Sequence, residues 1–393
     1  MILHDAGFGF GLPGGGAEAY CELLSTINLH LDNAIIKVAL GKEEGVGVVT
    51  LEGSKIPIAR TIYDKHITEG LRELCKDFKA DLIHANILNA HYPLIVSRIS
   101  RSLGLPLIVT VHSWAYLCPT AWNVMLPEPV PCAVSSMNRR CLKCMMFREG
   151  SRRSQLTAAV KMLHGTYALQ LLLKGASCVI SPSAFFAKRL YERLGIRAYH
   201  IPNPVNPLLL REEPRSEGDS SVVFVGRLEF EKGVHLLPCL AKIINPINVH
   251  VLGRGRLEEL LLQGRFPNLF YHGFVTEHEK LDLIRKTSVM IIPSVWCDMF
   301  PTTVFEAFAL GKPVVAFDLG GPKEMIEASG GGLLAKPFDI ENFAEKVTYL
   351  VENPTEARKM GLMGRRWIEK NLHPDCFAES LAKVYEYAMI SGK

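Results

Sequence analysis

The sequence lacks the features of several protein classes. No stretch of about 18 uninterrupted apolar residues occurs, and the longest apolar segment, residues 156–178, is interrupted by two lysines and a histidine. The first residues, MILHDAG, have neither the basic start nor the long apolar core of a signal peptide. We therefore expect a cytoplasmic protein that does not span a membrane.

Long runs of like charge, low-complexity segments and repeats of fixed period are also absent. The net charge is only +4, so an extended nucleic-acid surface is not expected, whereas anionic small ligands or lipid headgroups remain as partners. Hydrophobic residues make up 48% and charged residues 21% of the chain, which predicts that it folds throughout.

Short apolar runs alternate with longer helical patterns, an order typical of βαβ units in a parallel sheet covered by helices on both faces. In the first half, strands are predicted at residues 1–3, 35–40, 47–51, 81–85, 107–111 and 178–181, and helices at 16–28, 65–79 and 92–103. In the second half, strands are predicted at 221–225, 248–252, 269–272, 289–292 and 313–317, and helices at 339–353, 354–371 and 375–390. The predicted fold class is α/β in both halves.

The composition changes at residues 200–214, which contain four prolines and a cluster of charges. Helices and central strands avoid this spacing, so we interpret the segment as an interdomain linker. A length of 393 residues also favours two domains. We assign residues 1–203 to an N-terminal domain, 204–220 to the linker, 221–370 to a C-terminal domain and 371–393 to a helix expected to pack back on the N-terminal domain.

In each domain, one glycine-containing loop follows the first strand. Residues 8–18, FGFGLPGGGAE, precede a predicted helix, whose N-terminus favours an anion; a simple tight turn is the alternative. Residues 226–233, GRLEFEKG, contain Arg227 and Lys232, two cations that suit a diphosphate at a strand end; a solvated charged turn is the alternative.

An acidic pair is the strongest signal. The chain reads PSVWCDMFPTTVFEAFALG from Pro293, and seven residues separate Asp298 from Glu306. A helix is predicted to begin near Thr302, which places Glu306 about one turn into it. Both carboxylates then accept from hydroxyls in one crevice, as a sugar and a ribose require, and the helix start suits a phosphate.

In combination these motifs resemble a GT-B glycosyltransferase of the large retaining family 4, over nearly the whole chain. The resemblance implies two Rossmann-like, doubly wound parallel-sheet domains facing across a cleft. By match, Glu306 binds the donor ribose and Asp298 contacts the transferred sugar, although the family usually has the longer Glu at the Asp298 position. Arg227 and Lys232 match the family's cations on the donor diphosphate.

The resemblance implies further donor contacts. Gly15 and Gly16 match an N-terminal glycine loop that approaches the phosphates, and Gly253, Gly273 and Val275 match the loops that line the nucleotide-base pocket. The remaining donor-binding positions, through backbone N–H groups, are Phe300, Pro301, Thr302 and Thr303.

His112 ends the predicted strand 107–111, where the family commonly places a histidine near the reacting sugar; a structural histidine is the alternative. We predict that His112 orients hydroxyls and stabilises the departing phosphate in the transition state. The resemblance implies front-face displacement with retention, in which the leaving diphosphate helps to remove the acceptor proton. Apart from the nucleoside-diphosphate sugar, no cofactor or catalytic metal is required by that scheme.

Four of the ten cysteines, Cys118, Cys132, Cys141 and Cys144, lie in an expected insertion at about residues 115–150 of the N-terminal domain. Four thiolates suit a tetrahedral structural zinc ion, and the last two form a Cys-x-x-Cys pair. The spacing is irregular, so reduced or redox-paired cysteines in a loop are the alternative.

The acceptor is expected on the N-terminal domain, as a glycan or a lipid-linked saccharide of cell-surface polysaccharide or glycolipid synthesis. The apolar helical segment 156–173 is surrounded by basic residues, namely Arg148, Arg152, Arg153, Lys161 and Lys174. Such a helix lies at the inner face of an anionic membrane or forms a core helix with a charged outer side.

Two other function classes stay open from the sequence. A nucleotide-sugar-binding subunit without turnover is one, because Asp298 replaces the usual Glu. A sugar-nucleotide epimerase on the same fold is the other, and it differs from a transferase in releasing no nucleoside diphosphate.

Overall fold

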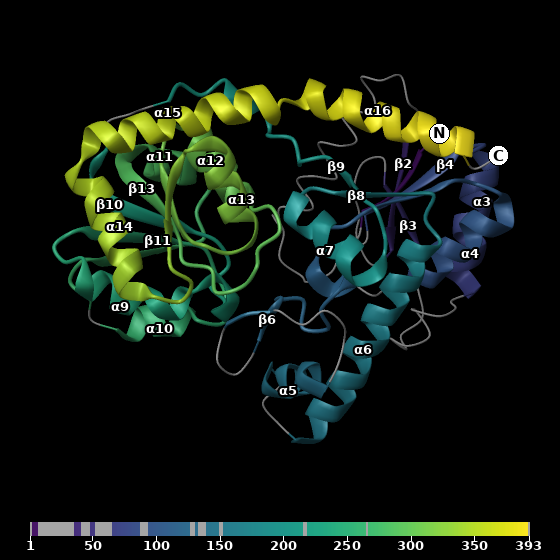
Figure 1. Cartoon of the computed structure of the whole chain (residues 1–393), viewed down its shortest axis with the longest axis horizontal. Coiled ribbons are helices and arrows are strands. Elements are labelled where there is room, and N and C mark those ends of the chain that lie inside the picture. Colours follow the sequence, from purple (N-terminus) through teal and green to yellow (C-terminus); the bar gives the residue numbers. More distant parts are fainter. Residues whose placement is uncertain are drawn as a thin grey trace. The chain divides into compact units, whose positions relative to one another are not determined.

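A computed structural model describes residues 2–6, 35–40, 48–51, 65–86, 93–125, 130–132, 139–148, 152–214, 218–264 and 266–391. The chain divides into two compact units (Figure 1). The first unit comprises Met1–Pro127, Ala133–Pro204 and Pro374–Lys393, and the second comprises Glu128–Cys132 and Val205–His373. The helix predicted at residues 16–28 lies outside the described residues.

The first unit is built on a seven-stranded parallel sheet in the order β3-β2-β1-β4-β5-β8-β9. Its strands are β1 (Ile2–Ala6), β2 (Ile35–Leu40), β3 (Val48–Leu51), β4 (Leu82–Asn86), β5 (Leu107–Thr110), β8 (Cys178–Ser181) and β9 (Tyr199–His200). Every residue of β4, β5 and β8 is buried, as expected for parallel strands covered on both faces.

The helices of this unit are α3 (Lys65–Asp77), α4 (Pro93–Leu103), η1 (Trp114–Tyr116), α5 (Arg139–Arg148), α6 (Arg152–Lys174), α7 (Ala184–Leu194) and α16 (Pro374–Ser391). Two short strands precede α5 in sequence: β6 (Val124–Met125) belongs to the first unit, and β7 (Val130–Pro131) belongs to the segment Glu128–Cys132 of the second.

The last helix, α16, contributes to the core of the first unit. Its buried Phe377, Leu381 and Val384 pack with residues of β4, β5 and β8. The completely buried ring of His84, on β4, lies 2.8 Å through Nδ1 from the Tyr385 hydroxyl and 2.7 Å through Nε2 from the Thr110 hydroxyl. A buried polar contact therefore holds α16 against the sheet.

The second unit contains a six-stranded parallel sheet in the order β12-β11-β10-β13-β14-β15. Its strands are β10 (Asp219–Val225), β11 (Asn248–Leu252), β12 (Leu269–Gly273), β13 (Thr287–Ile292), β14 (Val314–Phe317) and β15 (Gly332–Ala335). The order reverses at β10, which pairs with β11 on one side and β13 on the other. Open α/β sheets bind ligands beyond the carboxyl ends of strands at such a point.

The helices of the second unit are α8 (Pro207–Leu210), η2 (Phe230–Lys232), η3 (Val234–Leu236), α9 (Leu237–Ile243), α10 (Glu258–Gln263), α11 (Glu277–Lys286), α12 (Thr302–Ala309), α13 (Gly320–Ser329), α14 (Ile340–Glu352) and α15 (Pro354–Asn371). The strands predicted at 178–181 and 248–252, and the helix start near Thr302, are confirmed.

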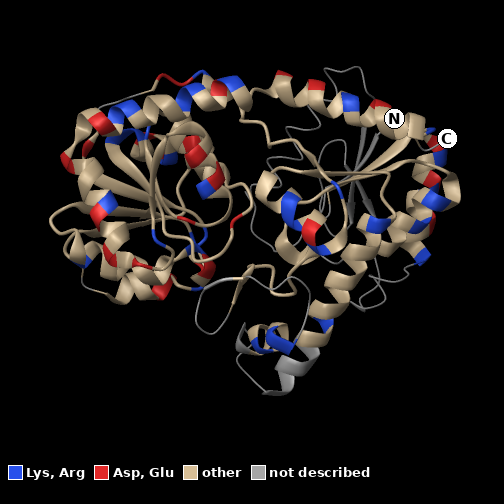
Figure 2. Ribbon diagram, viewed as in Figure 1, with Lys and Arg blue, Asp and Glu red and all other residues tan. Residues whose placement is uncertain are grey.

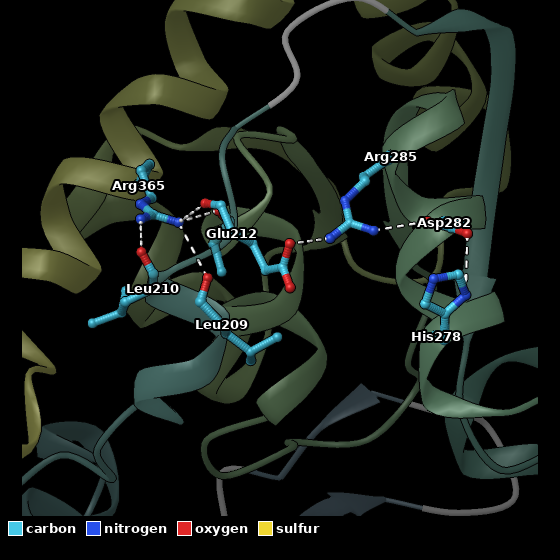
Figure 3. A network of polar contacts seen from close by, with 8 residues as sticks. Leu209, Leu210, Glu212, His278, Asp282, Arg285 and Arg365 are labelled. Carbon is cyan, nitrogen blue, oxygen red and sulfur yellow. Dashed lines mark hydrogen bonds and ion pairs between the residues drawn. The ribbon is translucent and has the colours of Figure 1, made fainter.

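The proline-rich segment interpreted as a linker contains one short helix, α8, which its proline spacing did not indicate. Pro207 occupies the first position of α8, where its missing N–H costs nothing, and the Asn206 side chain caps Leu208 N–H at 2.9 Å. Arg365 of α15, which is buried, then donates to the carbonyls that end this short helix (Figure 3).

The Arg365 guanidinium lies 3.0 Å from the Glu212 carbonyl oxygen and also bonds the carbonyl of Leu210. It reaches the carbonyl of Ala309, the last residue of α12. Beside it, Glu212 forms an ion pair with Arg285 of α11 (Figure 3). One side chain thus joins α15, the segment after α8 and the carboxyl end of α12.

The buried contact between α16 and β4 gives a stability prediction. Tyr385→Phe leaves a ring nitrogen of His84 without its hydroxyl partner, and we expect the free energy of unfolding to fall by about 1–3 kcal/mol. Tyr387→Phe is the matched control, because Tyr387 lies on the same helix and is 53% exposed; its effect should stay within about 0.5 kcal/mol. Urea unfolding followed by circular dichroism measures both, and equal effects would contradict the role of the His84 contact.

Candidate active site

Several predicted site residues follow the carboxyl ends of strands in the second unit. Arg227 and Lys232 follow β10, Gly253 follows β11, Gly273 ends β12 and Asp298 follows β13. These strands are parallel, so their carboxyl ends lie at one edge of the sheet. The topology therefore gathers loops that are far apart in sequence.

Lys232 and Asp298 are in direct contact. The Lys232 amine forms an ion pair with Asp298 Oδ2 and lies 5.1 Å from the centre of the Trp296 ring. Both charged side chains are mostly buried. The contact joins the loop after β10 to the loop after β13, across 66 residues of sequence.

Arg227 is more open than Lys232. Its guanidinium is 3.2 Å from Glu231 Oε1; the Glu231 carboxylate is buried, whereas half of the arginine side chain is exposed. Sequence reasoning missed this partner, although the spacing of four residues is the signal that indicates such pairs. Arg227 keeps an exposed cationic surface at the end of β10.

Glu306 forms a second ion pair at the start of α12. Its Oε1 accepts a hydrogen bond of 2.9 Å from the Lys280 amine of α11, and that amine is also 2.8 Å from Glu277 Oε2. Burial raises the pKa of the Glu306 carboxyl, and the Lys280 charge and hydrogen bond oppose that rise. Its other oxygen, Oε2, is buried and has no hydrogen-bond partner among the described residues.

The start of α12 leaves backbone donors available in part. The residue before the helix, Pro301, provides no side-chain cap. Proline also lacks an N–H, so the expectation that residues 300–303 all donate is wrong at Pro301. The Phe300 side chain belongs to the core of this unit and lies 5.2 Å from the Phe305 ring. The N–H groups of Thr302 and Thr303 are in the first turn, which has no preceding carbonyls to pair with.

Two of the predicted base-binding positions are joined directly. Gly253 N–H donates to the Gly273 carbonyl at 2.8 Å, so the loops after β11 and β12 are held together. Val275 is half-buried and packs against the core. The backbone of Gly273 has a φ of 72°, a conformation that favours glycine.

Close backbone contacts fix the charged loops. A Cβ atom on Gly233 would lie 1.8 Å from the carbonyl oxygen of Pro293, and Gly233 has a φ of 76°. On the other side of Asp298, Gly321 N–H donates to the Asp298 carbonyl at 2.5 Å. A side chain at Gly233 would separate the Lys232 loop from the end of β13.

His112 lies in the first unit, directly after β5. Its Nε2 is 3.2 Å from Oδ1 of the buried Asn86, and the amide oxygen can only accept, so Nε2 carries a proton. Burial lowers the pKa of His112 to about 3, which makes the imidazole neutral near pH 7. A neutral ring acts through hydrogen bonds rather than charge.

The zinc hypothesis is not supported. Among the described residues, no three His, Cys, Asp or Glu side chains are grouped as a metal ion would need. Cys141 and Cys144 lie on one helix, α5, and Cys118 Sγ is 3.2 Å from the Thr120 hydroxyl. Cys132 is half-buried, and all four cysteines are free thiols. The two thiols of α5 thus lack the further ligands of a tetrahedral site within the described residues, and the Cys-x-x-Cys spacing alone could not reveal this.

Some predictions lie outside the described residues. Gly15 and Gly16 are among them, and so are the side chains of Arg148, Arg152 and Arg153. Lys161 and Lys174 of α6 are exposed. Across the described ranges, every helix is too short or too polar to cross a membrane.

Two family models together match residues 40–367. The one described as Glycosyl transferases group 1 matches residues 207–367, and the one described as Glycosyltransferase Family 4 matches residues 40–207. An uncharacterized glycosyltransferase of Methanocaldococcus jannaschii is 28% identical over 254 residues, 63% of this chain and 70% of that protein. With three further curated relatives, a glycogen synthase of Mycobacterium tuberculosis among them, the match spans about half of their own length.

Solved structures share the fold. Sucrose-phosphate synthase from Thermosynechococcus elongatus has a TM-score of 0.73 at 18% identity, over 99% of each chain. HepE from Anabaena, in complex with UDP, has a TM-score of 0.68 at 17% identity, over 98% of this chain and 99% of that chain.

The close approach at Gly233 gives a second prediction. Gly233→Ala adds a clash with the Pro293 carbonyl to the strain of a positive φ, and we expect a loss of more than about 2 kcal/mol in the free energy of unfolding. Gly195→Ala is the control: φ is 68° there, and a Cβ meets no atom within 4 Å. That variant should lose only about 1–2 kcal/mol. Thermal unfolding compares the two, and an equal loss would mean that the backbone contact is unimportant.

Proposed function

Since the chain belongs to the glycosyltransferases of the family 4 type and has the GT-B fold, we propose that it transfers a sugar with retention of configuration to a glycan or lipid-linked acceptor. The donor of this enzyme is a nucleotide sugar. The observation that supports the proposal most is the contact of Lys232 with Asp298 just before the helix that carries Glu306.

The proposed donor site uses the Lys232–Asp298 and Lys280–Glu306 ion pairs of the second unit. Arg227 and Lys232 neutralise the diphosphate, and Thr302 and Thr303 supply N–H groups at the start of α12. Asp298 contacts the transferred sugar. Because Asp298 holds the Lys232 amine in the structure, an arriving phosphate shares that amine with the carboxylate.

The nucleoside end is proposed to lie at Glu306 and at the two base loops. The unpaired Oε2 of Glu306 accepts a ribose hydroxyl, which would remove the cost of a buried oxygen without a donor. Backbone groups at Gly253, Gly273 and Val275 meet the base. Structures similar in fold were solved with UDP and with UDP-glucose, which makes uracil nucleotides the first to test.

The proposed chemistry is front-face displacement. The bond from the anomeric carbon to the diphosphate breaks as the acceptor oxygen attacks from the same face, and the leaving diphosphate takes the acceptor proton. Arg227 and Lys232 stabilise the charge that develops on the diphosphate. In the first unit, Gly15 and Gly16 are proposed to approach the phosphates. The neutral His112, held by Asn86, orients sugar or acceptor hydroxyls.

A membrane contact is the second part of the proposal, and α5 supports it. This helix has exposed Arg139, Arg140 and Lys143 and no acidic residue (Figure 2). Leu142 and Met146, one turn apart, are 42% and 46% exposed. Basic and apolar side chains together suit an anionic membrane surface. Such a contact would place the enzyme at the inner face of the membrane, in polysaccharide or glycolipid synthesis.

The donor site is tested by thermal unfolding with UDP, GDP and ADP. We expect one of them to stabilise the protein by about 2.7 kcal/mol at a hundredfold excess over its dissociation constant. Glu306→Gln should raise the dissociation constant of this nucleotide at least about tenfold, because a neutral amide replaces the carboxylate. Glu356→Gln is the control, because Glu356 lies on α15 of the same unit and outside the proposed donor site; nucleotide binding should be unchanged in it. Failure of all three nucleotides to bind would reject the proposed donor site.

The stereochemistry is tested with the sugar nucleotide that matches the best nucleotide. An α-linked donor should give an α-linked product together with free nucleoside diphosphate, both detectable by NMR. A β-linked product would reject retention while leaving sugar transfer in place.

The membrane contact is tested by flotation with vesicles of phosphatidylcholine, with and without phosphatidylglycerol. We expect binding only to the anionic vesicles, and its loss in Leu142→Asp because a charge replaces the inserting side chain. Leu260→Asp, at a similarly exposed leucine of α10, should bind as the wild type does. Absence of flotation, or an equal loss of vesicle binding in both variants, would count against a membrane contact through α5.

A further inference from the structure

We propose that Lys280 is a positioning residue that keeps Glu306 ionised and holds its Oε2 ready for a hydroxyl of the nucleotide ribose. The proposal rests on the donor site described above and assigns a role to a side chain that no motif indicated. Lys280 itself touches neither the transferred sugar nor the phosphates in this scheme; it acts through Glu306.

The geometry of the carboxylate is asymmetric. Oε1 of Glu306 is occupied by the Lys280 amine at 2.9 Å, whereas Oε2 is buried and lacks a hydrogen-bond partner within the described part of the chain. The side chains of Lys280 and Glu306 are only 16% and 13% exposed. An amine bound to one oxygen prevents the carboxylate from rotating, so the other oxygen keeps a fixed direction.

The charge state of Glu306 depends on two groups of α11. Burial raises the pKa of Glu306, the cationic Lys280 lowers it, and the anionic Glu277 raises it again. Burial would lower the pKa of Lys280, but Glu306 and Glu277 together raise it above its ordinary value. Glu277 thus favours the charged amine but disfavours the charged Glu306, whereas the amine favours the charged Glu306 directly. Without Lys280, Glu306 would be a buried carboxyl with no cation beside it, and such groups take up a proton.

The position of Lys280 in the fold connects two proposed subsites. Helix α11 starts after Val275, where Thr276 and Glu279 form a capping box that fixes its first turn. Lys280 follows that turn directly, and it reaches α12 to bond Glu306. The loop proposed to meet the base and the carboxylate proposed to meet the ribose are thus linked by one amine.

The test compares a ribonucleotide with its 2′-deoxy counterpart, using whichever of UDP, GDP and ADP binds the full-length wild type. Both probes carry the same base and diphosphate, so the ratio of their dissociation constants reports the ribose hydroxyl, and the titration of the phosphates cancels. Calorimetry between about pH 5 and pH 9 gives this ratio for each variant.

We expect the wild type to prefer the ribonucleotide by about tenfold or more near pH 7, as for a hydroxyl donated to a charged acceptor. In Lys280→Met the preference should disappear near pH 7 and return only at higher pH, because the pKa of Glu306 rises. Lys280→Arg, which keeps the charge, should retain most of the preference. Lys286→Met removes an exposed lysine from the other end of α11 and should match the wild type.

Glu277→Gln gives a shift of opposite sign. Its carboxylate raises the pKa of Glu306, so its removal should let the preference persist to lower pH than in the wild type. Glu277 is 67% exposed, and its replacement is compatible with folding even if Lys280→Met is not. No shift in Glu277→Gln, or a shift to higher pH, overturns the proposal.

The remaining outcomes separate this proposal from the function on which it rests. If Lys280→Met weakens both probes equally at every pH, its role is structural and the positioning role is rejected, while the donor site stands. If Lys280→Met keeps the wild-type ratio throughout, the proposal also fails alone. If no nucleotide binds the wild type, both the donor site and the role of Lys280 are rejected.

Discussion

The arrangement of the second unit depends on the parallel pairing of β10 with β11 on one side and β13 on the other. Parallel pairing delivers three strand ends to the same edge, and glycines then let the following loops touch backbone to backbone. Gly233 lies against the Pro293 carbonyl, and Gly253 lies against that of Gly226. Larger residues would push these loops apart. The loops that carry the charged side chains of the site are therefore held by main-chain contacts as well as by the Lys232–Asp298 ion pair.

The buried charges of the site are paired with charges of opposite sign. Lys232 is paired with Asp298, Lys280 with Glu306 and Arg227 with Glu231, so each mostly buried charge has a partner of opposite sign. Such pairing removes most of the penalty for taking ions out of water. It also leaves specific groups for a ligand, namely the exposed part of Arg227 and the unpaired oxygen of Glu306. Binding thus needs little rearrangement of the acidic groups, apart from the sharing of Lys232.

The sequence was sufficient for the alternation of strands and helices and for the spacing of Asp298 and Glu306, because these follow from local periodicity. It was insufficient for the partners. Nothing in the composition of α11 indicates that Lys280 meets Glu306, since that contact depends on how two helices pack. The Cys-x-x-Cys pair of α5 is joined by no third ligand in the described part of the chain, which its spacing alone could not reveal. The start of α8 has local signals in Asn206 and Pro207, whereas the bonds to its carbonyls come from Arg365, more than 150 residues away. Local sequence patterns predict helices and strands, whereas the contacts of those helices and strands depend on residues that are distant in sequence.

The position of α16 bears on the order in which the chain is made. His84 is translated early, and its partner Tyr385 comes 301 residues later, after the entire second unit. Until α16 has been synthesised, the sheet of the first unit lacks one of the helices that cover its apolar residues, and the imidazole of His84 lacks the hydroxyl of Tyr385. The second unit, continuous from Val205 to His373 apart from one short segment, has no such delay. The half of the molecule synthesised first is thus the one whose core closes last, and the nascent protein has to remain soluble until then.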